Sequence, residues 1–84
     1  MPMHVPPHPG EFIRKVYLDT FGHTGRELAA KLDVSASTVA RPLGGTSSVS
    51  PEMALRLSKA LGRSAESWLS MQHHHDLWEA HQNA

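Results

Sequence analysis

The feature that most constrains this chain is a series of helix-start signals that divides it into short helical segments. Each signal is a serine or threonine whose side chain can accept a hydrogen bond from the first turn of a helix. Glu27 completes a capping box for the first signal, and Pro51 occupies a favoured first helical position. Apolar residues follow every signal at helical spacing, and no segment alternates long enough to predict a strand. The capping residues are Thr24, Ser35, Ser50 and Ser64.

These boundaries predict an all-α fold of five helices in a single domain that spans residues 1–84. Four prolines among the first nine residues disfavour helix there, so we expect residues 1–9 to form an extended arm. The first helix opens at His8 and ends at Gly22, and its expected apolar face consists of Phe12, Ile13, Val16, Tyr17 and Phe21. The other helices are expected at about 24–32, 36–43, 51–61 and 64–80. The apolar stripe of the fourth helix is expected to contain Ala54, Leu57 and Leu61, widened by Leu55.

Composition excludes several classes of protein. The chain contains no cysteine, which excludes a disulfide framework, a thiolate zinc site and a cysteine nucleophile. No apolar run approaches about 18 residues and the N-terminus lacks the pattern of a signal peptide, so we expect no membrane contact and a cytosolic location. No nucleophile–base constellation and no glycine-rich phosphate loop is visible, so we expect neither an enzyme nor a bound cofactor.

The formal net charge is zero, but the charges are unevenly distributed along the chain. Residues 14–63 carry all eight lysines and arginines and only four of the eight acidic residues, whereas residues 64–84 carry no lysine or arginine. A basic middle is compatible with a nucleic-acid surface. A solvated helical surface has similar charges, so the charge alone does not decide between the two.

Residues 24–43 have the pattern of a helix-turn-helix. Two short helices flank a tight turn, and Val39 and Leu43 are expected to face inward and fix the angle between them. The second helix of such a motif enters the DNA major groove, so its outward face needs small polar or basic groups. Each hydroxyl residue here also fits a plain cap or a surface position, but their clustering favours DNA contact. The candidate DNA-binding residues are Thr24, Arg26, Ser35, Ala36, Ser37, Thr38, Ala40 and Arg41.

Two stretches carry a family resemblance. The segment 24–62, TGRELAAKLDVSASTVARPLGGTSSVSPEMALRLSKALG, resembles the lambda-repressor-like helix-turn-helix domain of Cro type. Its flanks, HPGEFIRKVYLDTFG at 8–22 and SPEMALRLSKALGRSAESWLSMQHHHDLWEA at 50–80, resemble the HigA (VapI-like) antitoxins of bacterial toxin–antitoxin modules. The resemblance therefore covers nearly the whole chain.

The resemblance implies a homodimer that binds a double-stranded DNA operator, represses its own operon and neutralises a HigB-like toxin, which is a ribosome-dependent RNA-cleaving enzyme. It also implies that the C-terminal helix at 64–80 supplies dimer contacts, for which the candidates are Trp68, Leu69, Leu77 and Trp78. Both tryptophans fit core packing as well. The alternative functions are a stand-alone repressor without a toxin, and a toxin-binding module with weak DNA binding.

Five residues depart from the pattern of this family, and one of them is Gly44, where asparagine is usual. Gly25 and Ala36 replace residues that commonly contact DNA, and Asp33 stands where a turn glycine is usual. Pro42 replaces a leucine and lacks a backbone donor, so we expect it to distort the end of the third helix. Arg41 is then the single charge on the third helix, which is the recognition helix that would enter the major groove. Because neutralisation of phosphates dominates affinity for DNA, we expect weak or salt-sensitive operator binding.

Three consecutive histidines, His73, His74 and His75, lie in the last predicted helix. Adjacent helical residues point about 100° apart, so these side chains do not converge on one ion. We therefore expect no metal site. The segment fits a polar helix surface that contacts the toxin or a second subunit.

Overall fold

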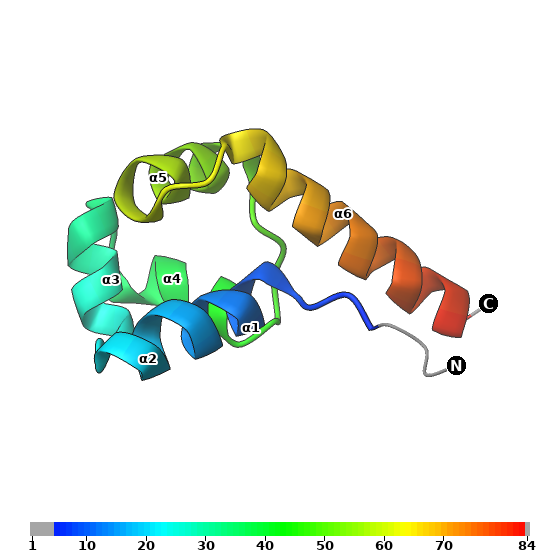
Figure 1. The fold of residues 1–84 in the computed structure, drawn as a ribbon, viewed down its shortest axis with the longest axis horizontal. Helices are drawn as coiled ribbons and strands as arrows, with labels where there is room; N and C mark the ends of the chain where they lie inside the picture. The colour runs from blue at the N-terminus through cyan, green and yellow to red at the C-terminus, as the bar shows by residue number, and fades with distance from the viewer. Residues whose placement is uncertain (1–4, 84) are drawn as a thin grey trace.

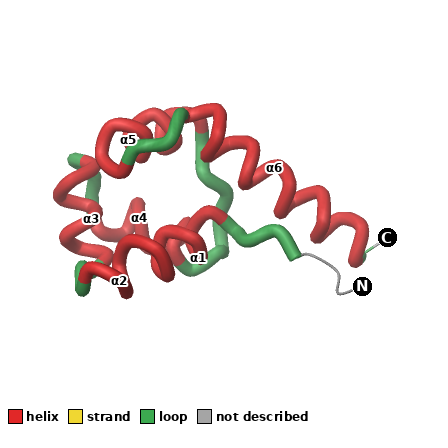
Figure 2. The backbone as a smooth tube through the Cα atoms, viewed as in Figure 1, coloured by secondary structure: helices red, strands yellow, loops and turns green. Residues whose placement is uncertain are grey.

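A computed structural model describes residues 5–83, which form five helices on short connections and no strand (Figures 1 and 2). The first helix is continuous and consists of α1 (Pro9–Ile13), a π-helical segment (Arg14–Leu18) and α2 (Asp19–Phe21). The other four helices are α3 (Gly25–Leu32), α4 (Ala36–Leu43), α5 (Pro51–Leu61) and α6 (Ala65–Gln82). The expected all-α, five-helix architecture is confirmed.

The π-helical segment changes which side chains of the first helix face the core. In a π turn the backbone bonds run from residue i to residue i+5, so the helix is locally wider than an α-helix. The Asp19 amide accordingly bonds to the Arg14 carbonyl. The buried residue that follows Ile13 is Leu18, five positions later. The expected α-helical stripe is therefore wrong at Val16 and Phe21, whose side chains are exposed.

The helix-start signals act as the sequence predicts. The Thr24 hydroxyl accepts from the Glu27 amide at 3.2 Å, and the Glu27 carboxylate accepts from the Thr24 amide at 2.9 Å, which completes the capping box. Ser35, Ser50 and Ser64 each accept a hydrogen bond from the backbone amide three residues later. Short local hydrogen bonds thus fix where four of the five helices begin.

The core lies where the first helix, α3, α4, α5 and the start of α6 meet. Trp68 is fully buried there, and its Nε1 donates to the Gly62 carbonyl at 3.2 Å. Leu55, expected to widen the stripe of α5, is instead exposed. The buried apolar residues are Ile13, Leu18, Leu28, Ala29, Leu32, Val39, Leu43, Val49, Met53, Ala54, Leu57 and Trp68.

The helix α6 extends beyond the other helices, and the N-terminal segment runs beside it (Figure 1). Residues 5–8 have no helical structure, and His75 Nδ1 of α6 donates to the Pro6 carbonyl at 3.0 Å. The first part of the expected arm, including Pro2, lies outside the described residues. Within residues 5–83, no helix has the length and apolar content needed to cross a membrane.

Candidate nucleic-acid interface

The helices α3 and α4 form the helix-turn-helix, and the turn between them depends on one residue. Asp33 ends α3 in the left-handed conformation with φ 59° and ψ 46°. A side chain in this region costs free energy that a glycine avoids. The Arg56 guanidinium supports the turn, because its Nη1 donates to the Leu32 carbonyl at 2.8 Å. The unusual Asp33 therefore adopts the conformation that the motif requires.

The outward face of α4 carries the predicted recognition residues. Val39 and Leu43 point into the core, with 3% and 8% of their surface exposed, which confirms the expected inward face. The side chains on the other side remain in solvent, as do the two candidates at the start of α3. All eight candidate DNA-binding residues are exposed: Thr24, Arg26, Ser35, Ala36, Ser37, Thr38, Ala40 and Arg41.

Hydroxyl groups cluster at the N-terminus of α4. Ser35 Oγ lies 3.2 Å from Ser37 Oγ and 2.7 Å from Thr38 Oγ1. Ser37 and Thr38 line a shallow hollow of about 350 Å³ together with Arg41 and Ser47. Ser47 belongs to the loop after α4, and nothing in the sequence beyond loop composition marks it as a site residue. Hydroxyls beside a guanidinium can donate to phosphate oxygens or to base edges.

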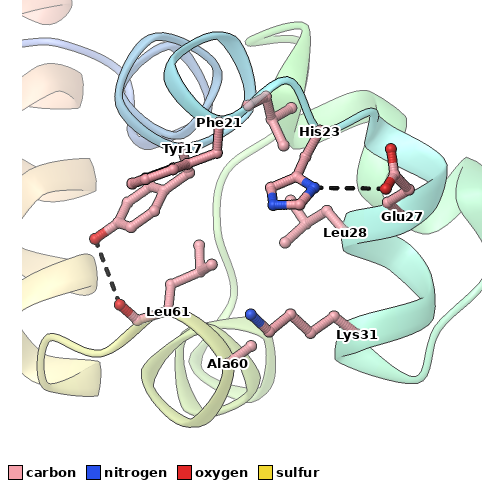
Figure 3. Close-up of a pocket in the computed structure, with 9 residues that line it drawn as sticks. Tyr17, Phe21, His23, Glu27, Leu28, Lys31, Ala60 and Leu61 are labelled. Atoms are coloured by element: carbon pink, nitrogen blue, oxygen red, sulfur yellow. Dashed lines mark hydrogen bonds and ion pairs between the residues drawn. The ribbon is translucent and has the colours of Figure 1, made fainter.

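The basic side chains of the motif point to two different places. Arg26 and Arg41 are exposed and form no ion pair within residues 5–83. Lys31, by contrast, lines a pocket of about 290 Å³ between α3 and the end of α5, near Ala60 and Leu61 (Figure 3). Lys31 therefore does not share a surface hollow with Arg41, and the cations best placed to contact DNA are the two arginines.

Within residues 5–83, Lys31 forms no ion pair with Glu27 of the same helix. Glu27 lies four residues before Lys31, which is the spacing of a helical ion pair. The Glu27 carboxylate instead accepts a hydrogen bond from the Thr24 amide, and His23 Nδ1 lies 3.4 Å from its other oxygen. The Thr24 backbone bond and the His23 contact hold the pKa of Glu27 below its ordinary value. In Figure 3 the Lys31 ammonium points over the pocket and away from Glu27.

The end of α4 is packed tightly against the start of the first helix. The α-helix continues through Pro42 to Leu43, so the expected distortion of its end is wrong, and Pro42 only lacks a backbone donor. A Cβ atom on Gly10 of α1 would lie 1.7 Å from the Pro42 carbonyl oxygen, so only glycine fits there. The position of the recognition helix α4 therefore depends on the position of the first turn of α1.

The candidate dimer residues of α6 are divided between the core and the surface. Trp68 is fully buried in its own chain, so its side chain cannot reach a second copy and this candidate is wrong. Leu69 and Trp78 are half-buried, and Leu77 is 50% exposed. Leu77 and Trp78 line an apolar groove of about 670 Å³ between α6 and the segment that contains Pro6. Three of the four candidates thus remain available to a partner.

The three consecutive histidines have different surroundings. His73 and His74 are exposed, whereas His75 is half-buried and bonded to the Pro6 carbonyl. Across residues 5–83, no group of three metal-binding side chains lies close enough to hold an ion.

Two short helices with a buried inner face and an exposed polar recognition face define a helix-turn-helix DNA-binding domain. The sequence model of the helix-turn-helix family (HTH_3) matches residues 13–68. Virulence-associated protein I of Dichelobacter nodosus is 38% identical over 76 residues, which cover 90% of this chain and 70% of that protein.

Comparison with solved structures shows which helix-turn-helix proteins this chain resembles in three dimensions. The antitoxin GraA superposes with a TM-score of 0.90 at 38% identity, over 96% of this chain and 87% of that chain. The Pseudomonas aeruginosa antitoxin HigA, solved with the higBA promoter, superposes with a TM-score of 0.86 at 35% identity, over 93% and 85% of the two chains. The chain belongs to the helix-turn-helix family and, within it, to the HigA-type antitoxins.

Proposed function

We propose that this protein binds an operator upstream of its own gene as a homodimer, represses transcription there, and neutralises a HigB-like toxin in the bacterial cytoplasm. The observation that carries the DNA-binding part is the exposed face of α4, where Ser37, Thr38 and Arg41 surround one hollow. The P. aeruginosa HigA structure contains promoter DNA, and its similarity to this chain supports the same use of the fold. The antitoxin relatives support a toxin partner.

The expected affinity for DNA is modest and depends on salt. Arg26 and Arg41 are the unpaired cations best placed to contact phosphate, and a dimer doubles them to four charges. Each neutralised phosphate contributes about −0.9 to the slope of log affinity against log salt, so the slope should be about −3.6. Affinity should then fall by about 100-fold between 50 and 200 mM salt.

Titration with the DNA upstream of the gene tests the recognition surface. We expect R41A to weaken specific binding about tenfold or more, because each arm of the operator loses one contact. Lys59→Ala is the matched control, since this exposed cation on α5 lies in a hollow with Lys31 and away from Arg41. Equal affinities for the three proteins would show that α4 does not read the DNA.

The proposed dimer uses the exposed part of α6. Leu77 and Trp78 border the apolar groove, and burial of this groove by a second copy would remove apolar surface from water. We expect Leu77→Glu to shift the protein to a monomer in sedimentation velocity. Glu66→Ala, an exposed change near the start of α6, should leave the dimer intact. A Leu77→Glu protein that sediments as the wild type would place the dimer contact elsewhere.

The toxin partner is tested by co-expression with the adjacent genes. A HigB-like toxin should co-purify in a defined ratio and lose its RNA-cleaving activity in the complex. If the purified protein binds its operator and no neighbouring product binds it, the function is that of a stand-alone repressor. If the toxin binds and the operator does not, the protein is a toxin-binding module.

A further inference from the structure

Among the described residues, two polar side chains are buried, and both bind the same loop. His8 is 6% exposed and Gln72 is 5% exposed. His8 Nε2 lies 3.1 Å from the Ser47 carbonyl, and Gln72 Oε1 accepts from the Val49 amide at 2.9 Å. The loop 44–50 that receives them follows the recognition helix directly. Buried polar groups are costly unless they are bonded, so these contacts hold the loop in one position.

The hydrogen bonds of His8 fix its protonation state. Its Nδ1 accepts from the Gly10 amide at 2.9 Å and thereby caps the first helix. That nitrogen must carry a lone pair, so the proton of the neutral ring is on Nε2, which donates to the Ser47 carbonyl. A second proton on Nδ1 would point at the Gly10 N–H. Charged His8 therefore cannot cap the helix.

The groups that face His8 come from α6 as well as from the loop. The His75 ring packs edge-on against the His8 ring with centroids 5.2 Å apart, and Asp76 and Glu79 lie on the same helix. Burial and His75 lower the pKa of His8 below its ordinary value, and the Ser47 bond, Asp76 and Glu79 oppose this shift. On the α1 side lies Glu11, whose pKa is held below its ordinary value mainly by its hydrogen bond to Lys15.

The balance of these effects on the pKa of His8 determines how the stabilising contribution of His8 changes with pH. A depressed pKa means that the fold favours neutral His8, and its contribution is complete above the ordinary pKa of about 6.5. The contribution is lost as the pH falls below that value. Acid that protonates His8 in the folded protein should therefore break its contacts to α1 and to the loop.

These contacts reach the C-terminal end of the recognition helix by two routes. The loop that His8 holds begins at the C-terminal end of α4, and Gly10, which His8 caps, lies directly against the Pro42 carbonyl. We propose that His8 is a positioning residue for DNA recognition, which in its neutral form holds α4 at the angle that the operator requires and on protonation releases it. This inference rests on the proposed operator binding.

Protonation of the histidines as a group predicts the opposite pH dependence of operator affinity. The chain has seven histidines, and their protonation adds positive charge that strengthens binding to phosphate. Release by His8 instead weakens binding by up to about tenfold for each pH unit below its pKa. The direction of the change in affinity therefore separates the two effects.

The experiment measures operator affinity by fluorescence anisotropy from pH 8 to pH 5.5 at constant salt, with helix content followed by circular dichroism. His8→Asn keeps a helix-capping oxygen but does not titrate and cannot reach Ser47 in the same way. His73→Asn removes an exposed histidine of α6 and is the matched control. We expect the wild type and His73→Asn to lose affinity in acid, and His8→Asn to bind more weakly at pH 7.5 with no further loss in acid.

Three results would overturn the inference. The first is an affinity that stays constant or rises as the wild type is acidified. The second is a His8→Asn profile with the same acid loss as the wild type. The third is a loss of helix signal that follows the loss of affinity, which would make His8 a residue of general stability alone. Absence of operator binding at pH 7.5 would instead reject the proposed function itself.

Discussion

The contact between Gly10 and the end of α4 gives a sharp prediction for the substitution Gly10→Ala. The added methyl group would lie 1.7 Å from the Pro42 carbonyl oxygen, 2.6 Å from the Pro42 carbonyl carbon and 2.9 Å from Leu43 Cα. All three atoms belong to the backbone, so no side-chain rotation can relieve the overlap. The first turn of α1 must move away from α4 by about 1.3 Å to reach the shortest contact that real Cβ atoms show, and protein interiors resist such shifts.

The cost of this movement follows from known overpacking effects. Extra methyl groups in a packed interior cost about 1–3 kcal/mol, and a clash with backbone belongs at the upper end. A domain of this length has a total stability of roughly 5–10 kcal/mol, so a loss of about 3 kcal/mol is a large fraction of it. The melting temperature should fall by about 15 °C, since each kcal/mol shifts a small domain by about 4–8 °C.

Gly25→Ala is the matched control for this substitution. Its methyl group would lie 3.3 Å from Leu43 Cδ1, the end of a flexible side chain, and alanine favours a helix. Thermal denaturation by circular dichroism should show Gly25→Ala at or slightly above the wild type. Operator affinity should fall for Gly10→Ala even well below its melting temperature, because α4 is displaced. A Gly10→Ala protein that melts within about 3 °C of the wild type and binds DNA equally would refute the reasoning.

Three further substitutions test the cap, the turn and the core. Thr24→Ala removes the capping-box hydroxyl and should cost about 1 kcal/mol in denaturant unfolding. Asp33→Gly relieves the left-handed backbone at φ 59° and should raise stability by about 0.5–1 kcal/mol, while operator affinity also rises because a negative charge leaves the turn. Trp68→Ala empties a fully buried site and should lower the free energy of unfolding by about 3–5 kcal/mol. A loss below about 1 kcal/mol would contradict the core placement.

The sequence predicted those parts of the fold that depend on short-range interactions. Thr24, Ser35, Ser50 and Ser64 begin helices because each bonds to an amide three residues away, and this information is local. The inward face of α4 was equally predictable, because Val39 and Leu43 lie four residues apart in a short amphipathic helix.

The features that the sequence did not reveal depend on tertiary contacts. The π-helical segment moves the buried face of the first helix from Val16 to Leu18, and α-helical periodicity cannot anticipate that change. The Lys31 ammonium lies over a pocket beside Ala60 and Leu61 of α5, and no local sequence pattern places it there. The bond from His8 to the Ser47 carbonyl joins residues 39 positions apart, which no local pattern can predict.

Footprinting of the purified protein on the DNA upstream of its own gene tests the central claim most directly. A dimer that reads DNA through α4 should protect two half-sites with centres about 34 Å apart, one helical turn of DNA, and R41A should lose this protection at the same protein concentration. Uniform protection without half-sites, or a footprint that R41A leaves unchanged, would contradict sequence-specific recognition by this helix.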